Sequence, residues 1–544
     1  MTNDPDFPDS MSLRPPAKDH LIALALAAGF LALYALTVPG NHSEAEDAFN
    51  YALKVERNQS SDILTAEHVL YGPIMRKLFT AAHALGIADR AYPLMLGVSL
   101  VCGAASLAVL FLLLRRTMGL TVLAAGLTTS LTGLSYGFWR YSCETEIYIP
   151  AILVALLALW IAAPPDTAPW RVILAAGLGA WAALLHAFAA IPALAGIPVL
   201  YLVQRRVRSA CLYAILAGVV ALPPILFLGA GQFTDGLDAA RPAAAYVQPV
   251  KEAVGALTQA IVSGNFLFCL EPFRLGIQHL YPYRTLAEEV YMGQYAGARA
   301  AILPMGTLTA LLLAAGAGCL LTLRHDRRNP SRDAAAPQPG RRGLLAAAAL
   351  WLTLHVALVL WYEPGNPENW ILAIPAFWIL AGVAFIQPLT RAAPAVAMAL
   401  AVLLSLHNYF GGMRLVASRE SDYNAKKAEW LLAHATRDDL VLTCESPVFV
   451  RYLRYGCPAR VKYLLDANPT QVQRRLTQRK PMRGRVYATP DLFDPPAPLR
   501  MRYPRICEAV VQAMAPLAPG FREIAPTPFG GVFVWDPPPP PAAP

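Results

Sequence analysis

Residues 21–38, LIALALAAGFLALYALTV, form an uninterrupted apolar run, and the acidic segment 41–47, NHSEAED, follows almost directly. As a helix, a run of this length can cross the ~30 Å hydrocarbon core of a membrane. The run lacks a small-residue cleavage site and ends before Pro39 and Gly40, so we expect an uncleaved helix. The carboxylates behind it then lie at the membrane surface, which indicates chemistry at that interface.

The rest of the chain repeats this apolar pattern. The chain has 544 residues, of which 56% are hydrophobic and only 15% charged, and its mean hydropathy is +0.42. Several runs reach the ~20 residues that a spanning helix needs, so we predict a mainly α fold, a polytopic transmembrane helical bundle. The predicted spans, about eleven, are residues 21–38, 92–114, 119–138, 147–163, 171–188, 189–204, 210–231, 299–322, 343–361, 370–387 and 393–410.

The basic residues of the short loops predict the orientation of these spans. Arginines concentrate at 115–116, 205–208 and 324–342, always after an even-numbered span, and cytoplasmic loops carry such an excess. These loops and the N-terminus are therefore predicted to be cytoplasmic. The exterior side then receives the loops 39–91, 139–146, 232–298 and 362–369 and everything beyond residue 410. We expect an integral protein of the cytoplasmic (inner) membrane with its C-terminal domain in the periplasm.

The formal net charge of +9 could suggest a nucleic-acid partner. Much of the positive excess, however, lies in the predicted cytoplasmic loops, where the topology of a membrane protein already accounts for it. We therefore expect membrane lipids as partners, and no nucleic acid.

Four regions follow from these patterns. Residues 1–20 are predicted to be a disordered cytoplasmic tail, residues 21–410 the transmembrane module with its first exterior loop at 39–91, residues 411–536 a small exterior α/β domain, and residues 537–544 a disordered Pro/Ala tail. The α/β prediction rests on an alternation of strand-like and helix-like segments. The strand-like segments are 440–443, 461–464, 484–488 and 531–535, and the helix-like ones are 421–435, a helix from about 447, and 469–480.

The acidic segment itself fits the start of an amphipathic helix. Ser43 and Glu46 have the spacing of a capping box, in which Glu46 only returns to the backbone of Ser43. Asp47 lies one residue beyond the box and shares a helix face with Glu44 and Tyr51, three and four residues away. A carboxylate on such a face can accept a proton from a hydroxyl or amine, so Asp47 is the first catalytic candidate and Glu46 the second.

Polar groups also concentrate in three other exterior positions. His68 and Tyr71, with cations one turn beyond, suit a lipid phosphate, although a surface histidine and snorkelling side chains would look the same. Arg140, Glu144 and Glu146 stand at the mouth of a span, where charges are costly unless they are paired or functional. Arg140 and Glu144 alone could form a purely structural pair.

The remaining candidates have structural alternatives as well. His186 lies at the exterior end of the span 171–188 and could simply be a packing residue. The turn with Glu363, Asn366, Glu368 and Asn369 could serve only as a rigid connection flanked by aromatic residues at the membrane surface. All four concentrations nevertheless fall on one predicted side of the membrane, and this coincidence indicates a common site.

The order of these features resembles the GT-C class of membrane glycosyltransferases, which includes protein O-mannosyltransferases and lipid A aminoarabinose transferases (glycosyltransferase family 39-like). The resemblance rests on Glu46-Asp47 after the first span and on residues 68–73, HVLYGP, and covers roughly residues 20–410. Segments 144–148, ETEIY, 184–186, LLH, and 363–370, EPGNPENW, support it. The C-terminal domain from about residue 411 lies outside it.

The resemblance implies transfer of a sugar from a polyprenyl-phosphate donor to an unidentified lipid, glycan or protein acceptor on the exterior face. It implies Asp47 or Glu46 as the acid or base, although this chain has Glu-Asp where many members have Asp-Glu or a lone Asp. It also implies that His68, Arg140 and His186 lie near the donor. The candidate substrate-binding residues are Glu44, His68, Tyr71, Arg140, Glu144, Glu146, His186, Glu363, Asn366, Glu368 and Asn369. We expect no cofactor and no metal.

Two other functions are compatible with many spans. A flippase or transporter of lipid-linked sugars would also place charges along a pathway, but usually near the bilayer midplane, whereas the predicted spans here contain almost no Asp, Glu, Lys or Arg. A membrane-anchored sensor that binds through its C-terminal domain would leave the chemistry of the exterior loops unexplained.

Overall fold

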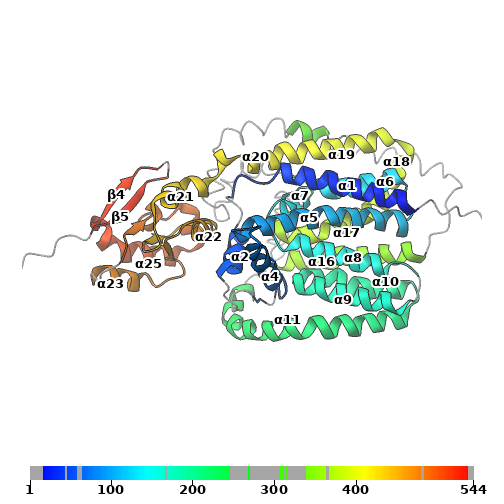
Figure 1. Ribbon diagram of the computed structural model, residues 1–544, viewed down its shortest axis with the longest axis horizontal. Coiled ribbons are helices and arrows are strands. Elements are labelled where there is room, and N and C mark those ends of the chain that lie inside the picture. The colour runs from blue at the N-terminus through cyan, green and yellow to red at the C-terminus, as the bar shows by residue number, and fades with distance from the viewer. Residues whose placement is uncertain are drawn as a thin grey trace, which may run out of the picture.

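The computed structural model describes residues 16–42, 46–57, 64–65, 67–165, 168–244, 267–269, 306–311, 314, 339–362, 367–478, 483–527 and 529–536. Side chains are described for these residues except 16, 46, 229–244, 339, 362, 367, 421, 498, 501 and 502. A helical bundle fills one part of the molecule, and a smaller domain with a sheet lies beyond one end of it (Figure 1).

Long apolar helices build the bundle, as predicted. Among the described residues, six helical segments are long and apolar enough to cross a membrane, and four further apolar helices are shorter than 18 residues. The predicted span 299–322 lies mostly outside the described residues, so the number of spans stays a prediction. The helices are α1 (Pro16–Leu36), α5 (Ala91–Leu112), α6 (Val122–Leu134), α8 (Tyr148–Ala162), α9 (Pro169–Leu185), α10 (Ile197–Val203), α11 (Val207–Ala244), α16 (Pro339–Tyr362), α17 (Ile374–Ala381), α18 (Gln387–Ala392) and α19 (Pro394–Asn408).

Some boundaries differ from the prediction. Helix α1 begins at Pro16, within the predicted disordered tail of residues 1–20, and helix α11 continues to Ala244, although we predicted an exterior loop from residue 232. The packing of α11 on α9 depends on a small residue, because a Cβ at Gly179 would lie 1.9 Å from the hydroxyl of Tyr213. That hydroxyl donates to the carbonyl of Ala193 at 2.9 Å. Close approach at small residues is how helices pack where lipid removes the hydrophobic driving force.

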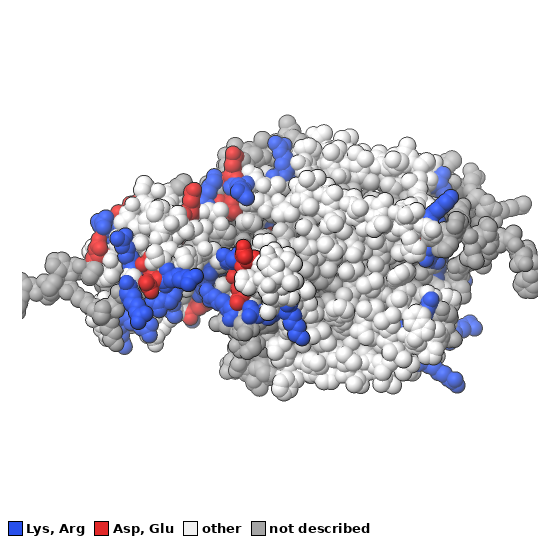
Figure 2. Space-filling model, in the orientation of Figure 1, with Lys and Arg blue, Asp and Glu red and all other residues white. Residues whose placement is uncertain are grey.

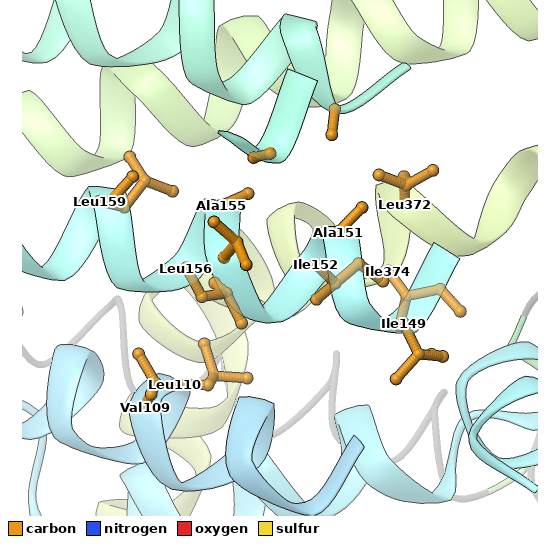
Figure 3. Close-up of a cluster of buried hydrophobic side chains, with 14 of the residues drawn as sticks. Val109, Leu110, Ile149, Ala151, Ile152, Ala155, Leu156, Leu159, Leu372 and Ile374 are labelled. Carbon is orange, nitrogen blue, oxygen red and sulfur yellow. The ribbon is translucent and has the colours of Figure 1, made fainter. Parts of the chain in front are cut away.

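The interior of the bundle is apolar. Val109 and Leu110 of α5 meet Ile152 and Leu156 of α8, and all four side chains are buried (Figure 3). The outer surface is apolar too, with exposed side chains such as Phe227, which is 83% exposed. In the space-filling view the flank of the bundle is almost free of charged residues, which gather at its ends and on the C-terminal domain (Figure 2). This is the distribution that a membrane-spanning bundle requires.

The loops collect at two opposite ends, as their predicted alternation demands. At one end Arg115 pairs with Asp19 at 3.3 Å, and the Gln204 side chain donates to the carbonyl of Ala163 at 2.8 Å. At the other end the amide of Leu70 donates to the carbonyl of Leu184 at 2.9 Å. The predicted cytoplasmic loops around residues 115 and 205 therefore share the first end, and the first exterior loop lies at the second.

The second end also holds the short helices α2 (Glu46–Arg57), α4 (Tyr71–Ala84) and α7 (Tyr136–Ser142) and the 3-10 segment η6 (Pro367–Ala373). Helix α2 forms because Ala48, Phe49, Ala52 and Val55 recur at helical spacing and are all buried. Since α2 is amphipathic, its other face is free to carry the polar residues Asp47, Tyr51 and Lys54. The predicted amphipathic helix of the first exterior loop is confirmed, although the described part begins at Glu46.

The C-terminal domain is an α/β sandwich around a five-stranded sheet of order β2-β1-β3-β5-β4. Strand β1 is parallel to β2 and β3, and β5 is antiparallel to β3 and β4. The elements are α20 (Arg414–Ala417), α21 (Tyr423–His434), β1 (Leu440–Thr443), α22 (Pro447–Gly456), β2 (Arg460–Tyr463), α23 (Pro469–Thr477), β3 (Val486–Ala488), α24 (Ala497–Arg502), α25 (Pro504–Met514), β4 (Phe521–Ala525) and β5 (Val532–Trp535). The predicted α/β alternation is confirmed, and α20, α24, α25 and β4 were not predicted.

Candidate active site

Helix α2 presents its polar face to the loop that contains His68. The hydroxyl of Tyr51 lies 3.2 Å from Nε2 of His68, and the two rings meet edge to face. Burial lowers the pKa of His68, and the nearby Glu67 and Asp47 only partly oppose this effect. The imidazole is therefore neutral at pH 7, and it offers a hydrogen bond to a ligand.

The second exterior loop contains two glutamates with different surroundings. The first, Glu144, accepts hydrogen bonds from Arg140 at 3.0 Å, from the hydroxyl of Tyr92 at 2.7 Å and from the amide of Thr145 at 3.1 Å. Burial alone would raise the pKa of Glu144, but Arg140 and these hydrogen bonds lower it overall. The buried pair of Arg140 and Glu144 is thus the structural alternative that we considered for these residues.

The second glutamate, Glu146, is only 2% exposed, and its Oε2 atom has no hydrogen-bond partner among the described residues. Burial raises the pKa of Glu146 well above its usual range, and repulsion from Glu368, Asp47 and Glu144 raises it further. The repulsion also shows that these carboxyl groups lie within electrostatic reach of one another. Two carboxyls in one loop therefore have pKa values that move in opposite directions, which is typical of acid–base sites.

Three further candidate residues, His186, Glu368 and Asn369, lie at the same end of the bundle. The hydroxyl of Tyr148 lies 3.5 Å from Glu368, and its ring contacts that of His186 at 4.7 Å. The ring of His186 also stacks on that of His68 at 5.8 Å. His186 has a structural duty as well, because its Nδ1 accepts from the amide of Phe188 at 3.1 Å. Asn369 is buried, and its carbonyl oxygen contacts Nε2 of His355 at 2.6 Å.

A partly open hollow lies beside the Tyr51–His68 contact and encloses about 310 Å³, counting the space that opens to solvent. Its lining comprises Tyr51, Lys54, Val55, Thr65, His68, Tyr71 and Gly72. Three lining atoms, the hydroxyls of Thr65 and Tyr71 and Nδ1 of His68, are buried without a hydrogen-bond partner in the described part of the chain. Buried polar groups are normally paired, so three such atoms around one hollow indicate a place for a polar ligand.

Asp47 lies at the rim of the cluster, and its partner comes from the C-terminal domain. Its Oδ1 atom is 2.6 Å from Nη1 of Arg451 on α22. Both side chains are about one-third exposed, at 37% for Asp47 and 30% for Arg451. Asp47 therefore faces the buried acids on one side and an arginine on the other.

The structure thus brings together most of the predicted site residues. Those that gather at this end are Asp47, His68, Tyr71, Arg140, Glu144, Glu146, His186, Glu368 and Asn369. Glu44, Glu363 and Asn366 lie outside the described residues, and the Glu46 side chain is not described, so its capping alternative stays untested. Among the described residues, no three His, Cys, Asp or Glu side chains gather closely enough to hold a metal ion.

Sequence analysis missed three participants. Lys54 lines the hollow and could have been found from its spacing, because it follows Asp47 and Tyr51 on one helix face. Tyr148 was quoted within a motif but was not chosen as a candidate. Arg451 gives no local signal, since it is 404 residues from its partner Asp47.

Comparison with known proteins places this geometry in a known architecture. The sequence matches no family model and no curated protein. The structure, however, matches the crystal structure of apo ArnT from Cupriavidus metallidurans with a TM-score of 0.53 at 13% identity, over 95% of this chain and 98% of ArnT. The chain has the ArnT fold. Its match to ArnT bound to undecaprenyl phosphate has the same TM-score and identity, over 94% of this chain and 97% of ArnT.

The ArnT match confirms the predicted GT-C-like fold and corrects one expectation. We expected the resemblance to end near residue 410, but a match over 95% of the chain necessarily includes most of the C-terminal domain. The domain is therefore part of the ArnT architecture. It lies directly beyond α2 and the site in Figure 1.

Proposed function

We propose that this protein is an integral membrane glycosyltransferase that moves a sugar from a polyprenyl-phosphate donor to an acceptor on the exterior face. One observation carries the proposal. Glu146, a buried carboxyl with a raised pKa and an unpartnered oxygen atom, lies within electrostatic reach of Asp47 and Glu368 at one end of an ArnT-like bundle. Strongly shifted carboxyl groups that gather around a hollow are characteristic of acid–base catalysis.

The surroundings of Asp47 and Glu146 suggest a different role for each of these acids in the reaction. Asp47 is accessible from outside and forms an ion pair with Arg451, so it acts as the base that takes the proton of the acceptor hydroxyl. The acceptor oxygen then bonds to the anomeric carbon while the bond from that carbon to the phosphate oxygen breaks, and the phosphate leaves with the electron pair. Glu146 holds its proton and donates a hydrogen bond to the donor. Glu46 remains the second candidate for the base.

The hollow beside His68 supplies the donor side of the site. Its unpartnered polar atoms on Thr65, His68 and Tyr71 would bind sugar or phosphate oxygens, and Lys54 would balance the charge of the departing phosphate. The structure of ArnT with undecaprenyl phosphate supports a donor of this class, because that protein shares the fold. Arg140, which is paired with Glu144, would keep the second exterior loop in place rather than hold the phosphate.

Orientation and acceptor belong to the same proposal. The end that carries the site would face the periplasm, with the N-terminus in the cytoplasm, because the predicted cytoplasmic arginines lie at the opposite end. The acceptor would be a lipid, glycan or protein that reaches the site from that side, near the C-terminal domain.

The proposal is tested by following transfer in membranes that contain the full chain. Mass spectrometry would compare the wild type with Asp47→Asn and Glu46→Gln, measuring the loss of polyprenyl-phosphate sugar and the release of free polyprenyl phosphate. We expect Asp47→Asn to lower transfer at least ~100-fold, because general bases contribute 10²–10⁴-fold. Asp89→Asn, an exposed carboxyl of the same loop, is the matched control and should keep normal transfer.

Two outcomes would contradict the proposal. Full transfer by both variants in normally folded protein would remove the acidic segment from the reaction. Movement of labelled donor across the bilayer without its consumption would instead identify a transporter of lipid-linked sugars.

A further inference from the structure

Helix α22 of the C-terminal domain packs directly on α2. The ring of Phe49 lies at the centre of this seam, stacked on Tyr92 at 4.8 Å and edge to face with Tyr452 at 5.1 Å. At its far end the hydroxyl of Tyr455 donates to Glu56 at 3.0 Å, and Arg90 donates to the carbonyl of Tyr455 at 2.7 Å. The contacts of Phe49 with Tyr452 and of Glu56 with Tyr455 therefore join the two helices at positions other than Asp47.

Arg451 contacts Asp47 at the other end of the interface between α22 and α2, next to the candidate active site. Its guanidinium is 2.6 Å from the carboxylate of Asp47, which makes this a short, charge-assisted hydrogen bond. Because the aromatic contacts and Glu56 already dock α22, the position of Arg451 calls for a different explanation. It is the residue of the C-terminal domain that reaches a candidate catalytic group.

The charges around Asp47 supply that explanation. Glu146 and Asp47 repel each other, and Glu368 adds to the negative field. The hydrogen bond from Arg451 fixes the position of the Asp47 carboxylate against this repulsion. The guanidinium therefore holds the carboxylate in one place beside two other acids.

We propose that Arg451 is a positioning residue that holds the Asp47 carboxylate in place, so that the C-terminal domain supplies part of the active site. This inference rests on the proposed function. It gives the domain a direct role in the reaction, and it predicts that a correctly folded protein with an altered Arg451 turns over slowly.

The test measures kcat and the donor KM of the full chain in lipid nanodiscs, with release of polyprenyl phosphate as the signal. We expect Arg451→Ala to lower kcat ~10–100-fold and to change the donor KM less than ~3-fold, because a base that is misplaced affects the chemical step. Arg451→Lys, which keeps the charge, should recover most of the lost kcat. Arg454→Gln removes a charge from the same helix and should stay within ~2-fold of the wild type.

A double variant separates positioning from general damage. Asp47→Asn combined with Arg451→Ala should be no slower than Asp47→Asn alone, since Arg451 acts only through Asp47. Multiplying effects, an unchanged kcat in Arg451→Ala, or an equal loss in Arg454→Gln would overturn the role of Arg451. Full activity of both Asp47→Asn and Glu46→Gln would overturn the proposed function itself, so the two failures are distinguishable. Size-exclusion profiles and thermal unfolding establish that each variant is folded, and Arg451→Lys carries the test if Arg451→Ala is not.

Discussion

Buried carboxyl groups occur in two regions of this molecule. In one region two carboxyl groups share a buried lysine, and in the other a buried glutamate lies beside further acids. In the C-terminal domain, Lys427 forms a short contact with Glu445 and lies 2.8 Å from Asp491, and all three side chains are buried. At the exterior end of the bundle, Glu146 is equally buried, but its Oε2 atom has no hydrogen-bond partner in the described structure, and its neighbours Asp47 and Glu368 are acids.

The pKa shifts express the same contrast. Burial opposes the charge of Lys427, yet Asp491 and Glu445 raise its pKa well above the usual range. Burial would raise the pKa of Asp491, but Lys427 lowers it overall. Burial and Asp491 leave the pKa of Glu445 raised, although Lys427 opposes them. The buried lysine therefore offsets part of the cost of burying these carboxyl groups, whereas Glu146 forms no such ion pair in the described structure. A buried carboxyl group that lowers stability indicates a functional role, because selection tolerates a loss of stability where activity requires it.

The largest effect should follow from removing the lysine of the buried cluster in the C-terminal domain. Lys427→Met leaves two carboxyl groups buried without their cation, so it should lower the free energy of unfolding of the C-terminal domain by about 3–5 kcal/mol. Chemical denaturation in detergent measures this. Lys462→Met, an exposed lysine on β2, is the control and should stay within about 0.5 kcal/mol. A loss below about 1 kcal/mol for Lys427→Met would contradict the contrast.

The two glutamates of the second exterior loop offer the same contrast within three residues. Glu144→Gln leaves the buried guanidinium of Arg140 without its counter-charge and should destabilise the protein by about 3 kcal/mol. Glu146→Gln makes the same chemical change where no ion pair is lost, and it should not destabilise at all. Thermal unfolding of the two variants compares them directly, and equal losses would show that the pairing does not distinguish these sites.

Stability should also depend on pH through Glu146. Its native pKa is raised, so the stability that it contributes is complete below the ordinary value of 4.5 and is lost as the pH rises through the native pKa. Glu146→Gln cannot ionise, so its stability relative to the wild type should grow between pH 5 and pH 8, by up to about 1.4 kcal/mol for each pH unit below the native pKa. Unfolding curves at both values measure this, and a constant difference would mean that Glu146 does not titrate in that range.

The smallest expected effect compares two tyrosines. Tyr423→Phe removes a hydroxyl that contacts Glu445 and Lys427, so it should destabilise by about 1–2 kcal/mol. Tyr71→Phe removes a buried hydroxyl without a partner among the described residues, so stability should stay within about 0.5 kcal/mol while the donor KM rises ~5-fold. An unchanged KM for Tyr71→Phe would exclude its hydroxyl from donor binding.

Much of this architecture could be predicted because its signals are local. Apolar runs predict the helices, and strand β1 coincides with the predicted segment 440–443. Strand β4 was missed because Arg522 and Glu523 interrupt its apolar alternation. At the site, every second loop of a helical bundle lies at the same end. The sequence therefore predicted that Asp47, His68 and Glu146 share one end of the bundle.

The rest depends on tertiary contacts that leave no local trace. The sequence offered two roles for Arg140 and Glu144, and only the structure places them in one buried pair. It did not reveal the unpartnered state of Glu146, because the two glutamates look alike in the segment ETE. Arg451 appeared to be an ordinary surface charge, since its partner Asp47 precedes it by 404 residues.

The central claim is that the acids around Glu146 are the catalytic centre of a glycosyltransferase. The most direct measurement is donor turnover by Glu146→Gln beside Asp89→Asn, an exposed control, with the release of polyprenyl phosphate followed by mass spectrometry at pH 7. We expect Glu146→Gln to fold normally and to lose at least ~100-fold in turnover while Asp89→Asn keeps it. Full turnover by a folded Glu146→Gln would contradict this claim.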